Sequence, residues 1–115
     1  MAALESGIVD RILSYLNGLP KCKAEKLMGN AFSRDKPDIN GCWRGHMFKI
    51  EVKSDPKGYK ATEGQKLELI LWRNAGATTF IAYSVDDVKE LIGADYFAVP
   101  SKNGWKYINS QGKVI

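Results

Sequence analysis

The sequence predicts an α/β fold with a central mixed β-sheet flanked by helices, and three observations carry this prediction. Apolar residues recur at helical spacing near the N terminus, as in a helix with one buried face. Residues 47–53 alternate between apolar and charged side chains, as in a strand with one buried face. A second strand pattern follows after an intervening helix pattern, which is typical of a strand-helix-strand crossover.

Length and composition indicate one domain that spans residues 1–115. With 44% hydrophobic residues, a chain of this length can bury one core without disulfide or metal staples. Glu5, Asp10 and Arg11 interrupt the first apolar segment, so we expect a soluble, intracellular protein rather than a secreted or membrane-spanning one. The net charge of +4 and the pI near 9.1 favour contact with polyanions, although many proteins this basic bind no nucleic acid.

The first half of the chain is predicted to form a helix and three strands. Residues 4–18 form the helix, and its apolar face holds Leu4, Ile8, Val9, Ile12 and Leu16. Residues 21–53 form the strands, with turn residues at Asn30, 35–37, 40–41 and 44–45. In the last strand, Phe48, Ile50 and Val52 point to one face, and Lys49, Glu51 and Lys53 point to the other.

The second half is predicted to add two helices, a strand and a hairpin. The expected elements are a helix from 62 to about 75, a strand over 78–83, a helix from 84 to 93, and a hairpin of 96–99 and 105–108 around an Asn103–Gly104 turn. Thr62 with Gln65, and Ser84 with Asp87, match capping boxes at the starts of the two helices. The role of the hairpin stays open.

Asp38, Glu51 and Lys53 are the residues through which the sequence points to phosphodiester chemistry. Metal-dependent hydrolysis needs carboxylates that hold a cation, and Asp38 and Glu51 can supply them. The Val52 carbonyl would be a sufficient further ligand for Mg²⁺, which prefers oxygen atoms and keeps several waters. Lys53 shares a strand face with Glu51 and would bring an ammonium group to the attacking water or the developing charge. The alternative is a solvated polar face, because Glu-x-Lys alone is a common pattern.

The order of these residues resembles the PD-(D/E)xK nuclease superfamily, and residues 36–91 resemble a VRR-NUC domain within it. The matching positions are Pro37-Asp38-Ile39, Phe48-Lys49-Ile50-Glu51-Val52-Lys53, Gly58, Gln65, Gly76 and Ala82-Tyr83-Ser84. With the N-terminal helix included, the resemblance covers most of the chain. The family commonly has Gly-x-Pro-Asp, whereas this chain has Arg34-Asp35-Lys36-Pro37-Asp38, so the turn before the motif is expected to differ.

The resemblance implies a restriction-endonuclease-like core and a role for each site residue. Asp38 and Glu51 would bind Mg²⁺, for which Mn²⁺ would substitute, and Lys53 would assist catalysis. Gln65 would lie beside them, with helix capping as an equally weighted alternative. Glu5 is the candidate for the acidic residue that often completes this site from the first helix.

A metal-dependent endonuclease acting on DNA is the function that the resemblance implies. Similar stand-alone phage proteins act as homodimers on branched DNA such as four-way junctions, which implies work in the cytoplasm of a bacterial host. Lys57, Tyr59 and Lys60, in a loop after the predicted active strand, are candidate DNA phosphate contacts. Two alternatives remain: a nicking, flap or duplex endonuclease without junction preference, and a binding module that does not cleave.

The remaining candidates have simpler structural explanations. Cys22 and Cys42 lack the neighbouring Cys or His residues that a redox pair or a zinc site needs, so we expect reduced thiols. We expect His46 and Glu25 on the surface, and Asp86–Asp87 as charges at a helix N terminus. Trp72 is expected in the core, and packing is the default role for Trp43 and Trp105, with base stacking as the alternative.

Overall fold

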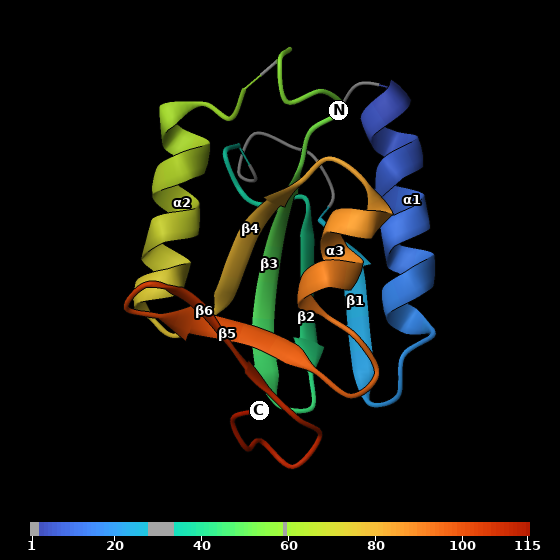
Figure 1. The fold of residues 1–115 in the computed structure, drawn as a ribbon. Helices are drawn as coiled ribbons and strands as arrows, with labels where there is room; N and C mark the ends of the chain where they lie inside the picture. The colour runs from blue at the N-terminus through green and yellow to red at the C-terminus, as the bar shows by residue number, and fades with distance from the viewer. Residues whose placement is uncertain (1–2, 28–33, 59) are drawn as a thin grey trace.

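A computed structural model describes residues 3–27, 34–58 and 60–115 and shows a four-stranded mixed sheet between helices (Figure 1). The elements are α1 (Ala3–Asn17), β1 (Cys22–Lys26), β2 (Ile39–Trp43), β3 (His46–Val52), α2 (Glu63–Asn74), β4 (Thr78–Ala82), α3 (Val85–Leu91), β5 (Phe97–Ser101) and β6 (Gly104–Ile108). The strand order is β1-β2-β3-β4, and β5 and β6 form a separate two-stranded sheet. The predicted α/β class with a mixed central sheet is confirmed.

Helix α1 forms because one apolar stripe repeats along its length. Val9, Ile12 and Leu16 are fully buried against the sheet, and Ile8 is nearly so, as the helical spacing predicts. Leu4 is 75% exposed, so its place on the buried face was wrong. Glu5, one residue further on, is half-buried instead.

Strands β1, β2 and β3 form an antiparallel meander, and the three strands predicted in residues 21–53 are confirmed. The predicted turn residue Asn30 lies outside the described residues. Ile39 at the start of β2 pairs with Ile50 near the end of β3, so these two strand ends lie at the same end of the sheet. The predicted turn at Arg44–Gly45 joins β2 to β3, but Asn40–Gly41 lies inside β2. A Cβ at Gly41 would lie 2.2 Å from the ring of Phe48, so this glycine serves close packing rather than a turn.

A crossover through helix α2 makes β4 parallel to β3. The Thr62 side chain accepts a hydrogen bond from the Gln65 backbone, and the Gln65 side chain accepts one from the Thr62 backbone. The predicted capping box is therefore confirmed. Ser84 caps α3 in the predicted way by accepting from the Asp87 backbone.

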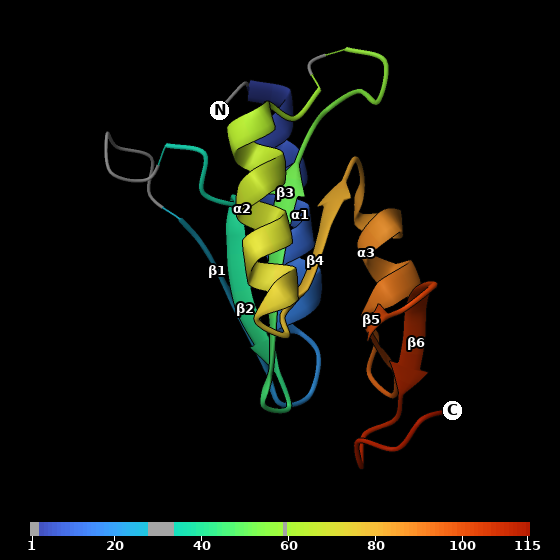
Figure 2. The same cartoon turned by 90° about the vertical axis from the view of Figure 1, so that its left-hand side faces the viewer.

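Helix α2 covers one face of the sheet, and α1 and α3 lie together on the other (Figures 1 and 2). The hairpin β5–β6 packs beside α3, where Phe97 stacks on Trp43 with ring centroids 4.9 Å apart. The predicted hairpin is confirmed, with Lys102 and Asn103 as its two turn residues, one position earlier than expected. One core thus joins the sheet, α1, α3 and the hairpin.

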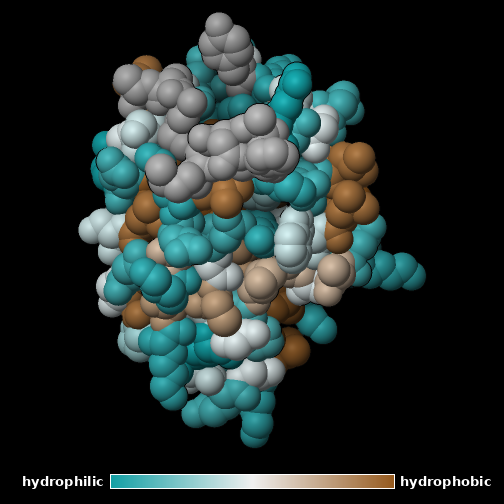
Figure 3. Space-filling model, turned by 180° about the vertical axis from the view of Figure 1, so that it is seen from behind, coloured by the Kyte–Doolittle hydropathy of each residue, from teal (hydrophilic) through white to brown (hydrophobic). Residues whose placement is uncertain are grey.

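Hydrophilic side chains dominate the back of the molecule, and hydrophobic ones appear there in separate groups (Figure 3). Among the residues that the structure describes, no helix combines the length and the apolar character needed to cross a bilayer.

Candidate functional site

The antiparallel pairing of β2 with β3 brings Asp38 to the end of β3. Asp38 immediately precedes β2, and its Oδ2 accepts a hydrogen bond from the Val52 backbone N–H at 2.8 Å. Its own carbonyl accepts from the Leu27 N–H at 2.9 Å. Asp38 and Glu51, which are distant in sequence, therefore meet as the motif predicts.

Glu51 is a buried carboxyl group whose environment opposes its charge. Its side chain is only 2% exposed. Burial, a hydrogen bond with Asp38 and the charge of Asp38 together raise the pKa of Glu51 to about 9, although nearby Lys53 opposes this rise. One oxygen, Oε2, is buried with no hydrogen-bond partner. A buried polar atom without a partner costs free energy, so this oxygen is a candidate ligand atom.

Lys53 follows β3 and lies on the Glu51 side, as strand alternation predicts. Its side chain is 9% exposed, and its backbone N–H donates to the Ala82 carbonyl at 3.0 Å. Lys53 is the positive charge that lowers the pKa of Glu51. The solvated polar face offered as an alternative is therefore wrong, because both charged side chains are buried.

Glu5 adds negative charge from the first turn of α1. Its carboxylate is near enough to raise the pKa of Glu51, although it is the smallest of the causes. Within the described part of the chain, however, no three acidic, His or Cys side chains lie close enough together to form a metal cluster. The metal-binding role of Glu5 stays a prediction.

The acidic pair and one backbone carbonyl fit a hard divalent cation. In a strand, the N–H and C=O of one residue point to the same side. The Val52 N–H points to Asp38, so the Val52 carbonyl lies on that side too. Two carboxylates and one carbonyl suit Mg²⁺, which keeps several waters, and the unpartnered Oε2 of Glu51 is the atom that such a cation would satisfy.

The first turn of α2, which includes Gln65, and the loop before it lie at the end of the sheet where β3 ends (Figure 1). The Gln65 Oε1 accepts from the Thr62 N–H at 2.9 Å, so its capping role is realised and a catalytic role stays a prediction. Lys57 and Lys60 are exposed, and Asp55 shapes their loop by accepting from the Lys57 N–H at 2.8 Å. Tyr59 lies outside the described residues.

The tryptophans are packing residues to different degrees. Trp43 is fully buried, and its Nε1 donates to the Gly93 carbonyl at 2.8 Å, which confirms packing over base stacking. Trp105 meets the ring of Phe80 edge-on. Trp72 is only half-buried and lies beneath the Lys49 ammonium, 3.9 Å from its ring centroid, so its expected place in the core was wrong.

The other simple assignments agree with the structure. His46 and Glu25 are exposed. Asp87 contributes to the start of α3 by accepting from the Tyr83 N–H at 2.7 Å. Cys22 and Cys42 are free. Burial raises the pKa of the Cys22 thiol to about 11.

A polar network on the α2 side of β3 was missed. Glu68 accepts from Lys36 at 2.7 Å and from the Trp72 Nε1 at 3.3 Å, and burial lowers the pKa of Lys49 above that tryptophan. Helical spacing alone could have paired Glu68 with Trp72, four positions on. Nothing in the sequence linked either residue to Lys36.

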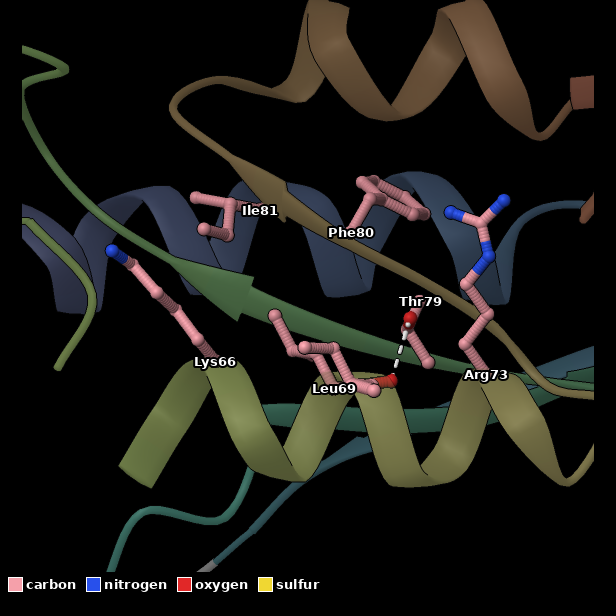
Figure 4. A pocket seen from close by; sticks show the side chains of 7 residues that line it. Lys66, Leu69, Arg73, Thr79, Phe80 and Ile81 are labelled. Carbon is pink, nitrogen blue, oxygen red and sulfur yellow. Dashed lines mark hydrogen bonds between the residues drawn. The ribbon is translucent and has the colours of Figure 1, made fainter. Parts of the chain in front are cut away.

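A cavity of about 370 Å³ lies between α2 and β4, away from the acidic pair. Figure 4 shows its lining side chains, Lys66, Leu69, Arg73, Thr79, Phe80 and Ile81. The Thr79 hydroxyl donates to the Leu69 carbonyl at 3.0 Å across its floor. Neither Asp38 nor Glu51 lines this cavity, so it is separate from the candidate metal centre.

The mixed sheet, its flanking helices and the acidic pair at the ends of β2 and β3 define an α/β fold of the restriction-endonuclease type. Among solved structures, a VRR_NUC domain matches with a TM-score of 0.64 and 25% identity over 77% of this chain and 94% of that chain. A VRR_NUC domain protein matches with a TM-score of 0.61 and 16% identity over 78% and 85% of the two chains. The chain is therefore similar in fold to VRR-NUC domains, which are nuclease domains. No family model and no curated protein sequence matches the chain.

Proposed function

We propose that this chain is a divalent-metal-dependent endodeoxyribonuclease, with Mg²⁺ as its cofactor and Mn²⁺ as a substitute. The observation that carries the proposal is the buried Glu51 carboxyl with an unpartnered oxygen beside Asp38. A protein gains no stability from such a pair, because each carboxyl disfavours the charge of the other. Binding a cation is the use that explains it.

Asp38 and Glu51 would hold the cation, with the Val52 carbonyl beside them. A cation held there polarises a phosphoryl oxygen and lowers the pKa of a water molecule. Lys53 lies within electrostatic reach of Glu51, and it would orient the attacking water and stabilise negative charge at the phosphate. Gln65 and Glu5 would support the site from α2 and α1.

DNA is the proposed substrate, and charge supports it. The exposed Lys57 and Lys60 lie in the loop that follows the site, where phosphates on either side of the cut would pass. The α1 and α2 N termini lie at the same end of the sheet (Figure 1), and helix N termini favour anions. Contact of the Tyr59 side chain with DNA belongs to the same proposal.

Branched DNA cut by a homodimer is the finer part of the proposal. One copy offers one acidic pair, so cutting two strands at a junction needs two copies. Leu67, Ile70 and Leu71 on α2 are 55%, 52% and 54% exposed, and adjoining aliphatic side chains of this kind suit an interface. The family resemblance leads us to propose a phage or prophage protein that works in the cytoplasm of a bacterial host.

Cleavage of a labelled four-way junction and a matched linear duplex, with and without Mg²⁺ or Mn²⁺, tests the proposal. Wild type would be compared with Asp38→Ala and Lys53→Ala, and with the exposed-residue control Glu25→Gln. Metal-dependent cutting by wild type and the control alone supports the nuclease. Equal cutting of both substrates would instead favour a nicking or duplex endonuclease. Binding without cutting under every metal would leave a binding module.

A further inference from the structure

The turn before Asp38 is fastened to helix α2 by two side-chain contacts. The Thr62 hydroxyl donates to Asp35 Oδ1 at 3.3 Å, and the Lys36 ammonium donates to Glu68 Oε1 at 2.7 Å. We propose that Asp35 and Glu68 are positioning residues that hold Asp38 beside Glu51. This inference rests on the proposed function in one respect, namely that Asp38 is a metal ligand.

Asp35 stands where the family pattern has glycine, and it takes up the same kind of backbone. Its φ is 67°, in the left-handed region that asparagine and aspartate tolerate better than most residues. The turn therefore keeps a conformation that glycine would adopt, while gaining a carboxylate. That carboxylate is where this chain departs from the family pattern.

The Asp35 carboxylate occupies space over the first turn of α2. A Cβ built on Gly64 would lie 2.4 Å from Asp35 Oδ2, so a side chain at residue 64 would displace the Asp35 carboxylate. The Thr62 hydroxyl links the two parts, because it accepts from the Gln65 N–H at 3.1 Å while donating to Asp35. The positive end of the helix dipole favours a carboxylate at this place.

Glu68 is held more firmly than an ordinary surface acid. Its side chain is 18% exposed, and the Trp72 Nε1 donates to the same Oε1 that accepts from Lys36. Trp72 is itself packed beneath Lys49. Lys36 is therefore tied to a residue whose orientation α2 and β3 already fix.

Displacement of Asp35 or Lys36 would also move Asp38. Pro37, which links Lys36 to Asp38, is buried and has a fixed φ, so it would transmit the movement. The two anchors also have a task. A charged Asp38 and a charged Glu51 would repel each other, and such repulsion would favour movement of the turn of Asp38 away from the sheet. Anchoring on α2 opposes that movement.

Hydrogen exchange of the Val52 amide measures the position of Asp38 directly, since Asp38 Oδ2 accepts its hydrogen bond. The measurement uses the full chain without metal, and Ile50, on the same side of β3, serves as internal reference. Asp35→Gly keeps the backbone conformation and removes the carboxylate, and Glu68→Ala removes the oxygen that accepts from Lys36. Both should speed Val52 exchange about tenfold, as expected for one lost hydrogen bond, and leave Ile50 unchanged. Asp35→Asn, which keeps a side-chain oxygen, should resemble wild type.

Glu63→Ala is the matched control, because it removes a negative charge from the same end of α2, where Glu63 forms an ion pair with Lys66 on its own helix. It should leave Val52 exchange unchanged. Unchanged Val52 exchange in Asp35→Gly and Glu68→Ala would overturn the inference. Equal acceleration of Val52 and Ile50 would also overturn it, because that result indicates general loosening of β3.

Gly64→Ala gives a second test, because the residue at position 35 should decide whether this substitution disturbs or stabilises the protein. In wild type the new methyl group meets Asp35, so Val52 exchange should accelerate. In the Asp35→Gly background the space is free, and alanine is the better helix former, so the same substitution should raise Tm and leave Val52 exchange alone. An identical effect in both backgrounds would contradict the contact.

Metal titration of cleavage links the positioning role to chemistry. Asp35→Gly and Glu68→Ala should raise the Mn²⁺ concentration for half-maximal cutting and keep a near wild-type rate at saturating metal. Unchanged half-maximal concentrations would overturn the positioning role. If wild type neither binds Mn²⁺ nor cuts DNA while Val52 exchange still responds, the proposed function fails and the anchoring of Asp38 stands.

Discussion

The two faces of β3 are both buried but differ in what burial does for the protein. Phe48, Ile50 and Val52 lie on one face, at most 1% exposed and inside the apolar core. Glu51 and Lys53 lie on the other face, which α2 covers, and they are 2% and 9% exposed. Burial of the first face stabilises the folded state. Burial of the second face destabilises it, because these side chains are charged.

This difference shows that the stability of the fold and the chemistry of the site are divided between the faces of one strand. A buried pair of unlike charges is weak evidence for stability, and here a second carboxyl, Asp38, adds repulsion. The apolar face, together with α1 and α3, holds the strand in place despite that cost. Substitutions on the two faces should therefore have opposite effects on the metal-free protein.

Phe48→Ala should give the largest effect. Removing this fully buried ring leaves a cavity next to Gly41 and Phe97, and should lower the free energy of unfolding by about 3–5 kcal/mol. Urea denaturation followed by far-ultraviolet circular dichroism measures it. Met47→Ala, at a neighbouring position that is 45% exposed, should change little. Equal losses in the two variants would show that Phe48 is not a core residue.

Glu51→Gln should move stability in the opposite direction and abolish activity. Glutamine has nearly the same shape and no charge, so at pH 8 without metal it should raise the free energy of unfolding by about 1–3 kcal/mol. The same variant should cut no DNA at any Mg²⁺ concentration. Glu25→Gln, an exposed acid on β1, is the control and should change neither quantity. A less stable Glu51→Gln protein would mean that the charged face contributes to the stability of the fold.

The stability of the metal-free protein should fall as pH rises from about 5 to 9. The pKa of Glu51 is raised to about 9 in the folded chain, against about 4.3 in an unfolded one. Between these values the folded state keeps a proton that the unfolded state has lost. Stability is therefore fully present below the lower value and decreases by at most about 1.4 kcal/mol for each pH unit above it.

Urea titrations at several pH values measure this slope, and Glu51→Gln should flatten it. Saturating Mg²⁺ should also flatten it, because a cation stabilises the charged form of Glu51. A slope that is the same in wild type and Glu51→Gln would assign the pH dependence to other groups.

The alternation of residues 47–53 was enough to predict both faces of β3, and the joint order of Asp38, Glu51 and Lys53 was enough to predict that they meet. Predictions of this kind depend on strand periodicity and on caps such as Thr62 with Gln65. Both patterns involve residues that are close in the sequence. The position of Asp35 over Gly64 was not predictable, because it depends on how a loop packs against a helix far along the chain. Trp72 was misplaced for the same reason: its helical face was right, but its cover is Lys49 rather than a core.

Lys49→Ala should have the smallest effect on the free energy of unfolding. It tests whether the charged face of β3 stabilises the fold at Lys49, although it destabilises the fold at Glu51. Its ammonium lies 3.9 Å from the centroid of the Trp72 ring, a contact that contributes about 0.5–1 kcal/mol. Lys49→Ala should lower the free energy of unfolding by that amount, Lys49→Arg should restore it, and Lys23→Ala on β1 should change little. A loss for Lys49→Ala beside a gain for Glu51→Gln would mean that the same face stabilises the fold at one residue and bears the cost of the site two residues later. Lys49→Ala as stable as Lys23→Ala would instead make the whole charged face a cost to stability.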